Sequence, residues 1–513
     1  MGFLEDIHVL SLIAFLPALG AIVIALLKRP DLQRVRWVAF AFTLASFLFS
    51  VALFAFFDKG DSGVQFIEKY EWISQIGVHY FLGVDGISLP MVIMTTFLGF
   101  IAVLVSWKID VRPKEYFAYL LLLETSILGV FLSLDLLMFL LFWEIELIPM
   151  YFLISIWGHG RKDYSAMKYV LYTLAGGAML IAGALLLYFK AGPSMPVVDG
   201  IQQSAFDMIA LRDAGLEGLA TSIPFLGAAF ALLLVGFSVK LPVVPLHTWL
   251  PDAHTDAPTA VSVMLAGSLL KMGGYGMIRL CVSIFPETAR DVAPIVIVFA
   301  VIGVVYGAAC TLRQTDAKRL VAYSSVSHMG YVLLGIFALS SMSVTGATLQ
   351  MFAHGVISGL LFAMCGILYD KAHTRHIPSL GGLARRMPVI VVLFSVGGLA
   401  ALGLPGTVGF AGEFLTFLGS FASTTVSGIE IYTIIAISGV VLSAGYILWM
   451  IERVFYREPK AEWDHVEDAD TVEKISTIAL IAVIMLVGIY PKILTDVISV
   501  GMDALSGVGI LTP

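Results

Sequence analysis

Long runs of apolar residues, each about 20 residues long, fill most of the chain and alternate with short polar segments. A run of this length crosses the hydrocarbon core of a bilayer as a helix, which satisfies its backbone hydrogen bonds within the segment. The pattern therefore predicts an all-α polytopic membrane protein with about fourteen transmembrane helices, near 8–28, 36–57, 84–107, 116–133, 135–157, 164–189, 223–248, 257–282, 292–312, 318–339, 345–369, 388–420, 431–455 and 474–495.

The basic residues divide unequally between the two sets of alternate loops. Of the 30 Lys and Arg residues, 21 fall at the loops near 28–36, 108–114, 161–168, 313–319, 371–386 and 453–474. Cytoplasmic loops of membrane proteins carry this positive excess, so we expect both termini on the outer face. The longest outer loops, 58–83 and 190–222, are expected to form short hairpins or surface helices.

Two of the predicted spans contain proline at depth. The seventh has Pro242 and Pro245 directly after Lys240, and the twelfth has Pro405 and Gly406. Proline removes a backbone donor, so both should be broken helices, and in a membrane such breaks line polar cavities. The breaks are five spans apart, and this odd offset predicts two inverted five-helix repeats. The expected divisions are 1–115 (helices 1–3), 116–282 (first repeat, helices 4–8), 283–456 (second repeat, helices 9–13) and 457–513 (acidic loop and helix 14).

Composition makes the few charges inside these spans unusual, because 59% of the residues are hydrophobic and only 13% are charged. Lys240, Lys271, Glu144 and Glu413 lie deep in apolar stretches, where a charge costs roughly 2.5–3.5 kcal/mol on insertion scales. One such residue can be a structural ion pair, but four favour an ion-transport path, with protons as the leading interpretation. The formal charge of −7 forms no patch and gives no support for nucleic-acid binding.

Glu144 and Glu146 compete for a place on this path, because residues two apart on a helix point to different faces. Glu144 lies about ten residues into its span, close to the bilayer middle, and we favour it by depth. A Glu144–Lys240 pair would act as a switch: together the two charges are tolerated, and when separated Lys240 tends to release a proton and Glu144 to take one.

Hydroxyl and imidazole groups on the tenth and eleventh spans could connect the charged sites. Lys271 lies among small residues, in GSLLKMGG, which leave room for water and close helix contact. His328 ends the run YSSVSH, and His354 and Ser358 follow in the next span, so these groups could pass a proton from Lys271 toward Glu413. Each histidine could equally be a packing residue.

The candidate metal and cofactor signals are weak. His247, Asp252, His254 and Asp256 superficially resemble a metal site, but we favour capping of the eighth helix and fixing of the loop. The three cysteines lie far apart in apolar segments and are expected to be packing residues. The sequence also lacks a nicotinamide fingerprint, a flavin motif and cluster-binding cysteines. We therefore expect no cofactor and no metal in this chain.

The run from Val239 to His254, VKLPVVPLHTWLPDAH, resembles the antiporter-like subunits of the proton-pumping NADH:quinone oxidoreductase, respiratory complex I. By motif, the family's fifth-helix glutamate, seventh-helix lysine and central eighth-helix lysine correspond to Glu144, Lys240 and Lys271. Paralogous subunits usually place lysine in the twelfth helix. The sequence GFAGEF at 409–414 has Glu413 there, which looks like the subunit M branch, the counterpart of mitochondrial chain 4.

The resemblance implies a non-redox subunit of a translocase, moving protons through a central chain of buried residues: Glu144, Lys240, Lys271, His328, His354 and Glu413. Quinone reduction would occur in partner subunits, which would hold the flavin, iron–sulfur clusters and quinone. The implied partners are other membrane-arm subunits, including antiporter-like paralogues, and lipids of a bacterial inner (plasma) membrane. A sodium/proton antiporter subunit and a structural membrane scaffold are the alternatives.

Overall fold

The computed structural model describes residues 7–28, 31–198, 201–215, 224–507, 509 and 511. Twelve helices in this part of the chain are long and apolar enough to cross a membrane. They include α2 (Val9–Leu26), α3 (Leu32–Phe56), α4 (Ser88–Val105), α5 (Pro113–Leu132), α8 (Lys162–Ala191), α15 (Pro286–Leu312), α16 (Ala317–Phe337), α17 (Ser341–Ala372), α20 (Ile429–Ile451) and α21 (Thr471–Ile489). The other two spans are composite: α6 (Leu136–Ile145) with α7 (Leu147–Trp157), and the segment Thr259–Val282.

The two remaining predicted spans are the broken ones, which confirms this part of the prediction. The seventh contains α11 (Pro224–Lys240), which ends at the break, and the helix that follows, α12 (Trp249–Asp256), lies beyond the predicted end at residue 248. The twelfth consists of α18 (Pro388–Ala401) and α19 (Val408–Ala422). The turn between α18 and α19 contains Gly403 and Gly406 at φ of 77° and 91°, a left-handed conformation that glycine adopts without strain. The division into two repeats stays a prediction.

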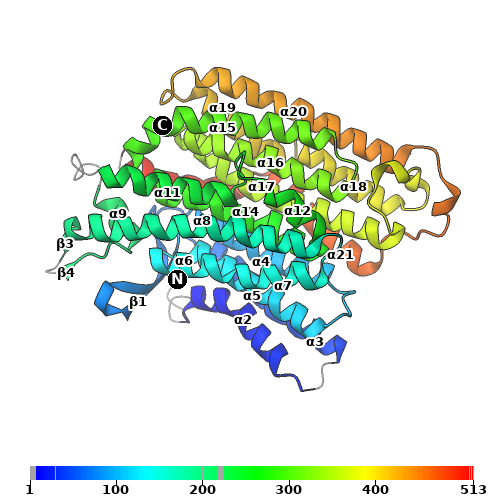
Figure 1. Ribbon diagram of the computed structural model, residues 1–513, viewed down its shortest axis with the longest axis horizontal. Helices are drawn as coiled ribbons and strands as arrows, with labels where there is room; N and C mark the ends of the chain where they lie inside the picture. The colour runs from blue at the N-terminus through cyan, green and yellow to red at the C-terminus, as the bar shows by residue number, and fades with distance from the viewer. Residues whose placement is uncertain are drawn as a thin grey trace.

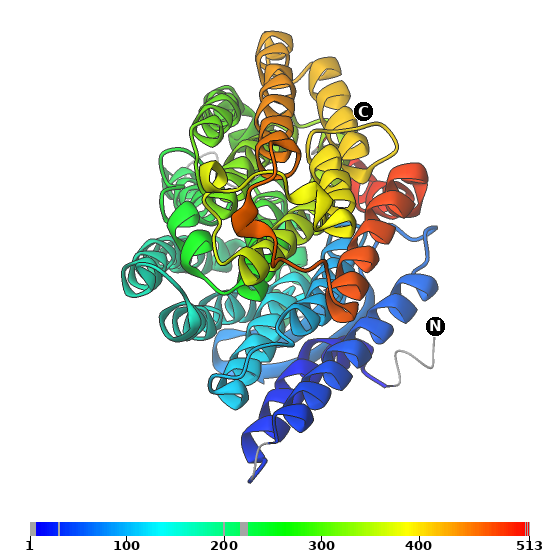
Figure 2. The same ribbon diagram turned by 90° about the vertical axis from the view of Figure 1, so that its right-hand side faces the viewer.

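The helices form one layered bundle with its most buried members in the middle. In Figure 1, α2 and α3 lie along one edge and α20 along the opposite edge, with α14 (Leu270–Gly276), α16 and α17 between them. Figure 2 shows the same order, from blue through green to orange. The segment Thr259–Val282 and α17 are buried on all sides, whereas α3, α8 and α20 expose apolar faces that suit lipid or a neighbouring subunit.

The span Thr259–Val282 is not a uniform α-helix. It consists of α13 (Thr259–Met264), the π-helix η3 (Leu265–Leu269), α14 and the π-helix η4 (Met277–Val282). A π-turn redirects side chains and changes which carbonyl each N–H reaches, and such turns are frequent at functional sites. This irregularity surrounds Lys271, and the sequence pattern gave no sign of it.

Two antiparallel hairpins add the only strands in the described residues. β1 (Gln65–Ile73) pairs with β2 (Val78–Val84), and β3 (Val197–Val198) pairs with β4 (Ile201–Gln202), followed by α9 (Met208–Asp213). These are the hairpins expected in loops 58–83 and 190–222. The ion pair between Lys69 and Asp207, 2.7 Å long, joins the two loops at the same end of the bundle.

The C-terminal region differs from the prediction of a single span at 474–495. Helix α21 ends at Ile489, Pro491 follows, and a separate helix α22 (Lys492–Gly507) begins. Proline inside a helix removes a backbone hydrogen bond and clashes with the preceding turn, so Pro491 separates two helices. Hydropathy alone does not detect this boundary. The prediction that both termini lie on the outer face falls on residues 1–6 and 512–513, which lie outside the described residues.

Candidate functional site

Lys240 is the last residue of α11 and lies directly at the helix break. Its ammonium forms an ion pair with Glu146, and the two side chains are 1% and 0% exposed. The hydroxyl of Tyr169, on α8, donates to the two carboxylate oxygens of Glu146 at 2.8 and 2.6 Å and lies 3.2 Å from Lys240 Nζ. The ring of Trp143 lies 5.4 Å from the ammonium. A buried charge needs both a counter-charge and hydrogen bonds, and this cluster supplies them.

The predicted pairing of Glu144 with Lys240 is wrong as a contact, because Glu146 is the partner of Lys240. Glu146 lies at the junction between α6 and α7 and points inward. Glu144 is half-buried and packs over α8, where a Cβ on Gly177 would lie 1.7 Å from its Oε1. Its helix neighbours Leu141, Ile145 and Ile148 are exposed. Depth along an apolar helix does not reveal which face points inward; tertiary packing decides it.

Lys271 lies in the centre of the bundle and is fully buried. Its side-chain nitrogen donates to the carbonyl of Ala266, five residues back in the π-helical segment, and lies 2.8 Å from Nδ1 of His354. The neighbouring Gly273 allows α14 to approach α11 closely, because a Cβ there would lie 2.6 Å from the backbone nitrogen of Leu241. Among the described residues, the hydrogen-bond partners of Lys271 and those of Lys240 are different groups, so no direct contact links the two sites.

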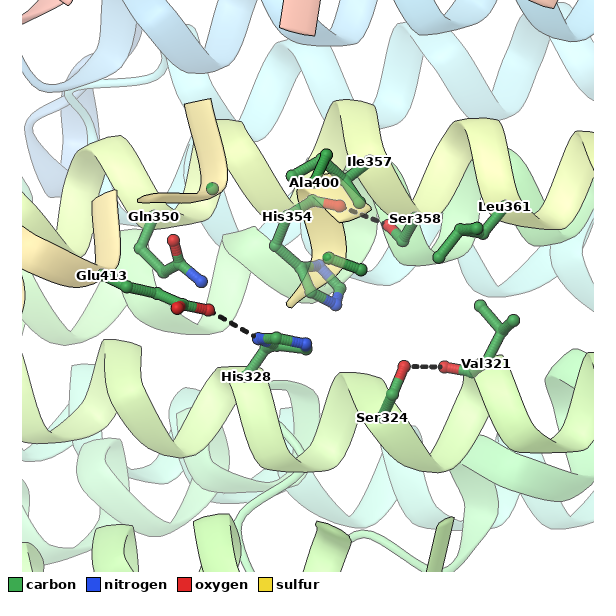
Figure 3. A pocket seen from close by; sticks show the side chains of 12 residues that line it. Val321, Ser324, His328, Gln350, His354, Ile357, Ser358, Leu361, Ala400 and Glu413 are labelled. Carbon is green, nitrogen blue, oxygen red and sulfur yellow. Dashed lines mark hydrogen bonds and ion pairs between the residues drawn. The ribbon is translucent and has the colours of Figure 1, made fainter. Parts of the chain in front are cut away.

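A line of titratable groups continues from Lys271 toward α19. The rings of His354 and His328 have centroids 5.7 Å apart, and Nδ1 of His328 lies 3.3 Å from Oε1 of Glu413 (Figure 3). This last contact lacks the alignment of a hydrogen bond, since His328 Nδ1 has no hydrogen-bond partner among the described residues. The break between α18 and α19 helps to place the carboxylate, because a Cβ on Gly403 would lie 2.6 Å from Glu413 Oε2.

A small cavity runs beside these groups, between α16, α17 and the broken helix. The space open to the centre of a water molecule is about 10 Å³, close to the least that holds one water. Figure 3 shows Glu413 and Gln350 at one end and Val321 and Leu361 at the other. The cavity therefore extends along α16 and α17 beyond the direct contacts.

The serine hydroxyl groups proposed for the relay donate hydrogen bonds to backbone carbonyls. Ser324 donates to the carbonyl of Val321 at 2.7 Å, and Ser327 donates to Val304 at 2.9 Å. Ser358 donates to the carbonyl of His354 at 2.5 Å. Ser324 and Ser358 nevertheless line the cavity, where their oxygens can accept a further hydrogen bond.

Two residues of this arrangement were missed by the sequence reasoning. Tyr169 completes the Lys240–Glu146 cluster, and Gln350 lines the cavity next to Glu413 with its buried Oε1 unpaired among the described residues. A signal for Gln350 exists in the sequence: Gln350, His354 and Ser358 are spaced by four residues and share one face of an otherwise apolar helix. No comparable pattern marks Tyr169.

The turn around α12 holds no metal-ligand set. Asp252 forms ion pairs with Lys168 at 2.7 Å and Arg319 at 3.5 Å, and the ring of His254 stacks on Phe362 with centroids 4.6 Å apart. Among the described residues, no group of three or more His, Cys, Asp or Glu side chains is arranged to hold a metal ion. These contacts favour fixing the loop. The predicted capping of the eighth helix is wrong, because no side-chain capping hydrogen bond is present at the start of α13, where the N-cap residue is Pro258.

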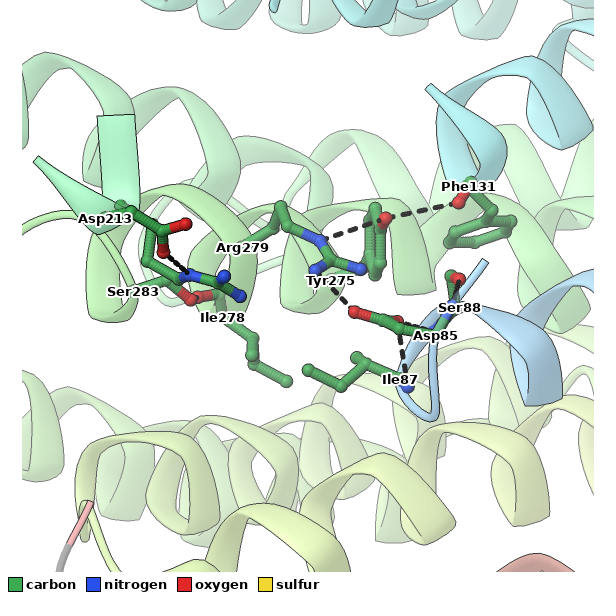
Figure 4. A network of polar contacts seen from close by, with 10 residues as sticks. Asp85, Ile87, Ser88, Phe131, Asp213, Tyr275, Ile278, Arg279 and Ser283 are labelled. Carbon is green, nitrogen blue, oxygen red and sulfur yellow. Dashed lines mark hydrogen bonds and ion pairs between the residues drawn. The ribbon is translucent and has the colours of Figure 1, made fainter. Parts of the chain in front are cut away.

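A second buried ion pair lies at the end of the bundle that carries the hairpins. Arg279 Nη1 binds Asp85 Oδ2 at 2.6 Å, and its Nε donates to the hydroxyl of Tyr275 at 3.2 Å (Figure 4). That hydroxyl in turn donates to the carbonyl of Phe131 at 3.1 Å. Asp85 also accepts hydrogen bonds from the backbone at Ile87 and Ser88. The network joins the start of α4, the end of α5 and the π-helix η4.

Comparisons with known proteins place this arrangement in a family. A family model described as NADH:quinone oxidoreductase/Mrp antiporter, TM matches residues 133–440. NADH-quinone oxidoreductase subunit M of Rhodobacter capsulatus is 42% identical over 506 residues, which cover 96% of this chain and 95% of that protein. The chain belongs to the subunit M family of NADH-quinone oxidoreductases. NAD(P)H-quinone oxidoreductase chain 4 1 of Synechococcus elongatus, a chain 4 homologue, is 41% identical and covers 98% of this chain.

Solved structures agree with the family assignment and confirm the resemblance given by the sequence. A chain of respiratory complex I from Thermus thermophilus superposes on this subunit M family member with a TM-score of 0.84 at 26% identity, covering 97% of this chain and 99% of that one. A chain of the Mrp complex from Dietzia has a TM-score of 0.83 at 20% identity, with 98% of each chain covered, which shows the shared fold alone. The chain is an antiporter-like membrane subunit of the complex I type.

Proposed function

We propose that this subunit moves protons across the membrane along Lys240, Lys271, His354, His328 and Glu413, coupled to quinone reduction in other subunits. The observation that supports this most is the line of contacts from Lys271 through His354 and His328 to Glu413, buried inside the bundle and beside a cavity. Imidazole groups both accept and donate protons near neutral pH, and the end groups are an amine and a carboxylate.

The energetics suit such a path. Charges held at membrane depth are costly, so small rearrangements of neighbouring charges shift where a proton resides. The membrane potential contributes about 2.3 kcal/mol per proton for each 100 mV, which equals a change of one to two pKa units. Separating Lys240 from Glu146 would therefore be enough to change the protonation of this pair. Glu146 would then have the switching role that the sequence predicted for Glu144. Glu144 packs against Gly177 of α8, and its buried Oε1 has no hydrogen-bond partner among the described residues.

The assembly follows from the same proposal. The chain would be the non-redox, translocating part of an enzyme whose flavin, iron–sulfur clusters and quinone lie in partner subunits. Its neighbours would be membrane-arm subunits, including antiporter-like paralogues, and lipids. The membrane would be the bacterial inner (plasma) membrane, with both termini on the outer face as the basic loops predict.

The test compares Lys271→Ala with wild type in the purified, reconstituted assembly. We expect NADH-dependent quinone reduction to be measurable and the number of protons moved per NADH to fall in the variant. His376→Ala is the control, because the His376 side chain is exposed and its ring nitrogen contacts the hydroxyl of Ser379 at the surface. A Lys271→Ala complex that pumps normally would refute the path.

The same preparation separates the antiporter alternative. Proton movement that requires a sodium gradient and no flavin- or cluster-containing partners would favour a sodium/proton antiporter. A structural scaffold predicts that removing any of the buried charges leaves pumping intact.

A further inference from the structure

Glu124 is a buried acid that the proposed path does not use. It lies near the middle of α5, is 1% exposed, and its Oε1 has no hydrogen-bond partner among the described residues. None of the described ion pairs includes Glu124. An uncompensated charge in such a place costs several kcal/mol, so the neutral acid is the favoured form at rest.

The packing around Glu124 leaves its carboxyl group against bare backbone. A Cβ on Gly99 of α4 would lie 2.3 Å from the carboxyl carbon and 2.4 and 2.5 Å from the two oxygens. Any larger residue at position 99 would therefore displace the group. Gly99 therefore leaves space at mid-membrane for the carboxyl group of Glu124. An apolar side chain in the same space would avoid the free-energy cost of burying a polar group.

Glu124 lies at the depth of the segment that holds Lys271. On α4, Gly99 receives Glu124, and the preceding residue Leu98 packs on Gly267, where a Cβ would lie 2.3 Å from its side chain. Consecutive helix residues differ by only about 1.5 Å in height, so Glu124 and Gly267 contact α4 at nearly the same level. About two turns farther along, α5 and the segment Thr259–Val282 are in direct contact, because the hydroxyl of Tyr275 donates to the carbonyl of Phe131 (Figure 4).

Polar atoms without partners occur on the Lys271 segment as well. The hydroxyl of Ser268, next to Gly267, is buried and has no hydrogen-bond partner among the described residues. Ser268 precedes Lys271 by three residues, about one turn. An unpaired carboxyl oxygen and an unpaired hydroxyl at one depth are the groups that a buried water molecule bridges.

We infer that Glu124 is a further protonatable site of this subunit, which exchanges a proton with Lys271 by way of Ser268 and water. In the forward step the O–H bond of Glu124 breaks and an N–H bond forms on neutral Lys271, leaving a carboxylate and an ammonium; the reverse step restores both. Among the described residues, Lys271 contacts an imidazole and a carbonyl but no carboxylate, and Glu124 would supply that acid. This inference rests on the proposed function.

The test uses Glu124→Gln in the whole assembly, because glutamine keeps the size and polarity but carries no exchangeable acid proton. We expect the infrared carbonyl band of a protonated carboxylic acid to be lost and proton translocation per NADH to fall several-fold. Ser268→Ala should lower translocation while retaining the infrared band. Thr125→Val, next in sequence, is the control and should pump as wild type does.

Normal translocation by assembled Glu124→Gln would overturn the inference, as would an infrared spectrum without the acid band in wild type. If Glu124→Gln failed to assemble, normal pumping by Ser268→Ala would overturn it. The proposed function has a separate outcome. If Lys271→Ala lowers pumping and Glu124→Gln does not, only the Glu124 exchange fails. If Lys271→Ala pumps normally, the path itself fails.

Discussion

The two halves of the bundle solve the same problem, a carboxylate at membrane depth, in different ways. Lys240 and Glu146 form a direct ion pair that Tyr169 completes, and neither charged side chain is more than 1% exposed. His328 and Glu413 lie 3.3 Å apart without an aligned hydrogen bond, beside a cavity and next to the unpaired oxygen of Gln350.

This difference indicates different tasks. A satisfied buried ion pair resists change, because separating it leaves two costly charges. An imidazole beside a carboxylate and a small cavity can gain or lose a proton with less rearrangement. The first half therefore suits a switch with two positions, and the second half suits a relay.

The largest effect should come from removing Glu146, which leaves the Lys240 ammonium buried without its partner. Breaking a buried pair in this way costs about 3–5 kcal/mol, so Glu146→Ala should lower the thermal stability and the amount of assembled complex. The matched variant Glu144→Ala should have a much smaller effect on both, because Glu144 is half-buried and does not contact Lys240. The measurement is thermal unfolding of the purified assembly.

Combining Glu146→Ala with Lys240→Ala removes both charges and should restore part of the lost stability, though not the pumping. If Glu144→Ala proves as damaging to stability as Glu146→Ala, the assignment of the ion pair in the first half is incorrect.

In the second half we expect activity to fall while stability holds. His328→Gln keeps a polar side chain but cannot relay a proton, so proton translocation should drop on the order of tenfold. Gln350→Leu should give a smaller loss, since Gln350 borders the cavity without carrying a proton. Both variants should unfold near the wild-type temperature. A strong loss of stability in His328→Gln would show that the second half is also a structural pair.

The smallest effect should come from the surface ion pair of Lys108 and Asp470, which lies outside both halves. Removing this pair should not change how the Lys240–Glu146 and His328–Glu413 sites differ in stability and pumping. Burial alone would raise the pKa of Asp470, but the backbone N–H of Glu473 and the Lys108 ammonium hold that pKa below its usual value. The resulting stability is present above the unfolded pKa of Asp and is lost as the pH falls through the lower folded value.

Lys108→Met removes this pair and also the ion pair of Lys108 with Glu473, 2.5 Å long. The loss of stability at neutral pH should still be only about 1 kcal/mol, because the Lys108 side chain is about half exposed to solvent. Thermal unfolding at neutral and acidic pH measures it: the difference between variant and wild type should shrink once Asp470 is protonated. A difference that persists unchanged in acid would mean that the ion pair is not its source.

Particular residues show how far the sequence could be interpreted. The runs of apolar residues predicted the spans, and Pro242, Pro245 and Pro405 predicted both broken helices, because each is a local chemical property of the chain. Glu144 was preferred to Glu146 because depth can be counted along a sequence. The inward-facing side cannot be counted when the helix is apolar on nearly every face. Gln350 had a detectable spacing, whereas Tyr169 had none.

The sequence by itself determined that this chain spans a membrane many times, where its helices break, and that costly charges lie at depth. These features follow from hydropathy, backbone chemistry and the price of burying charge, which act on each segment separately. Only the tertiary structure decided which carboxylate meets Lys240, that His354 and His328 lie between Lys271 and Glu413, and that Gly99 holds Glu124. Those contacts depend on helix rotation and close approach between segments far apart in the chain, which no single segment encodes.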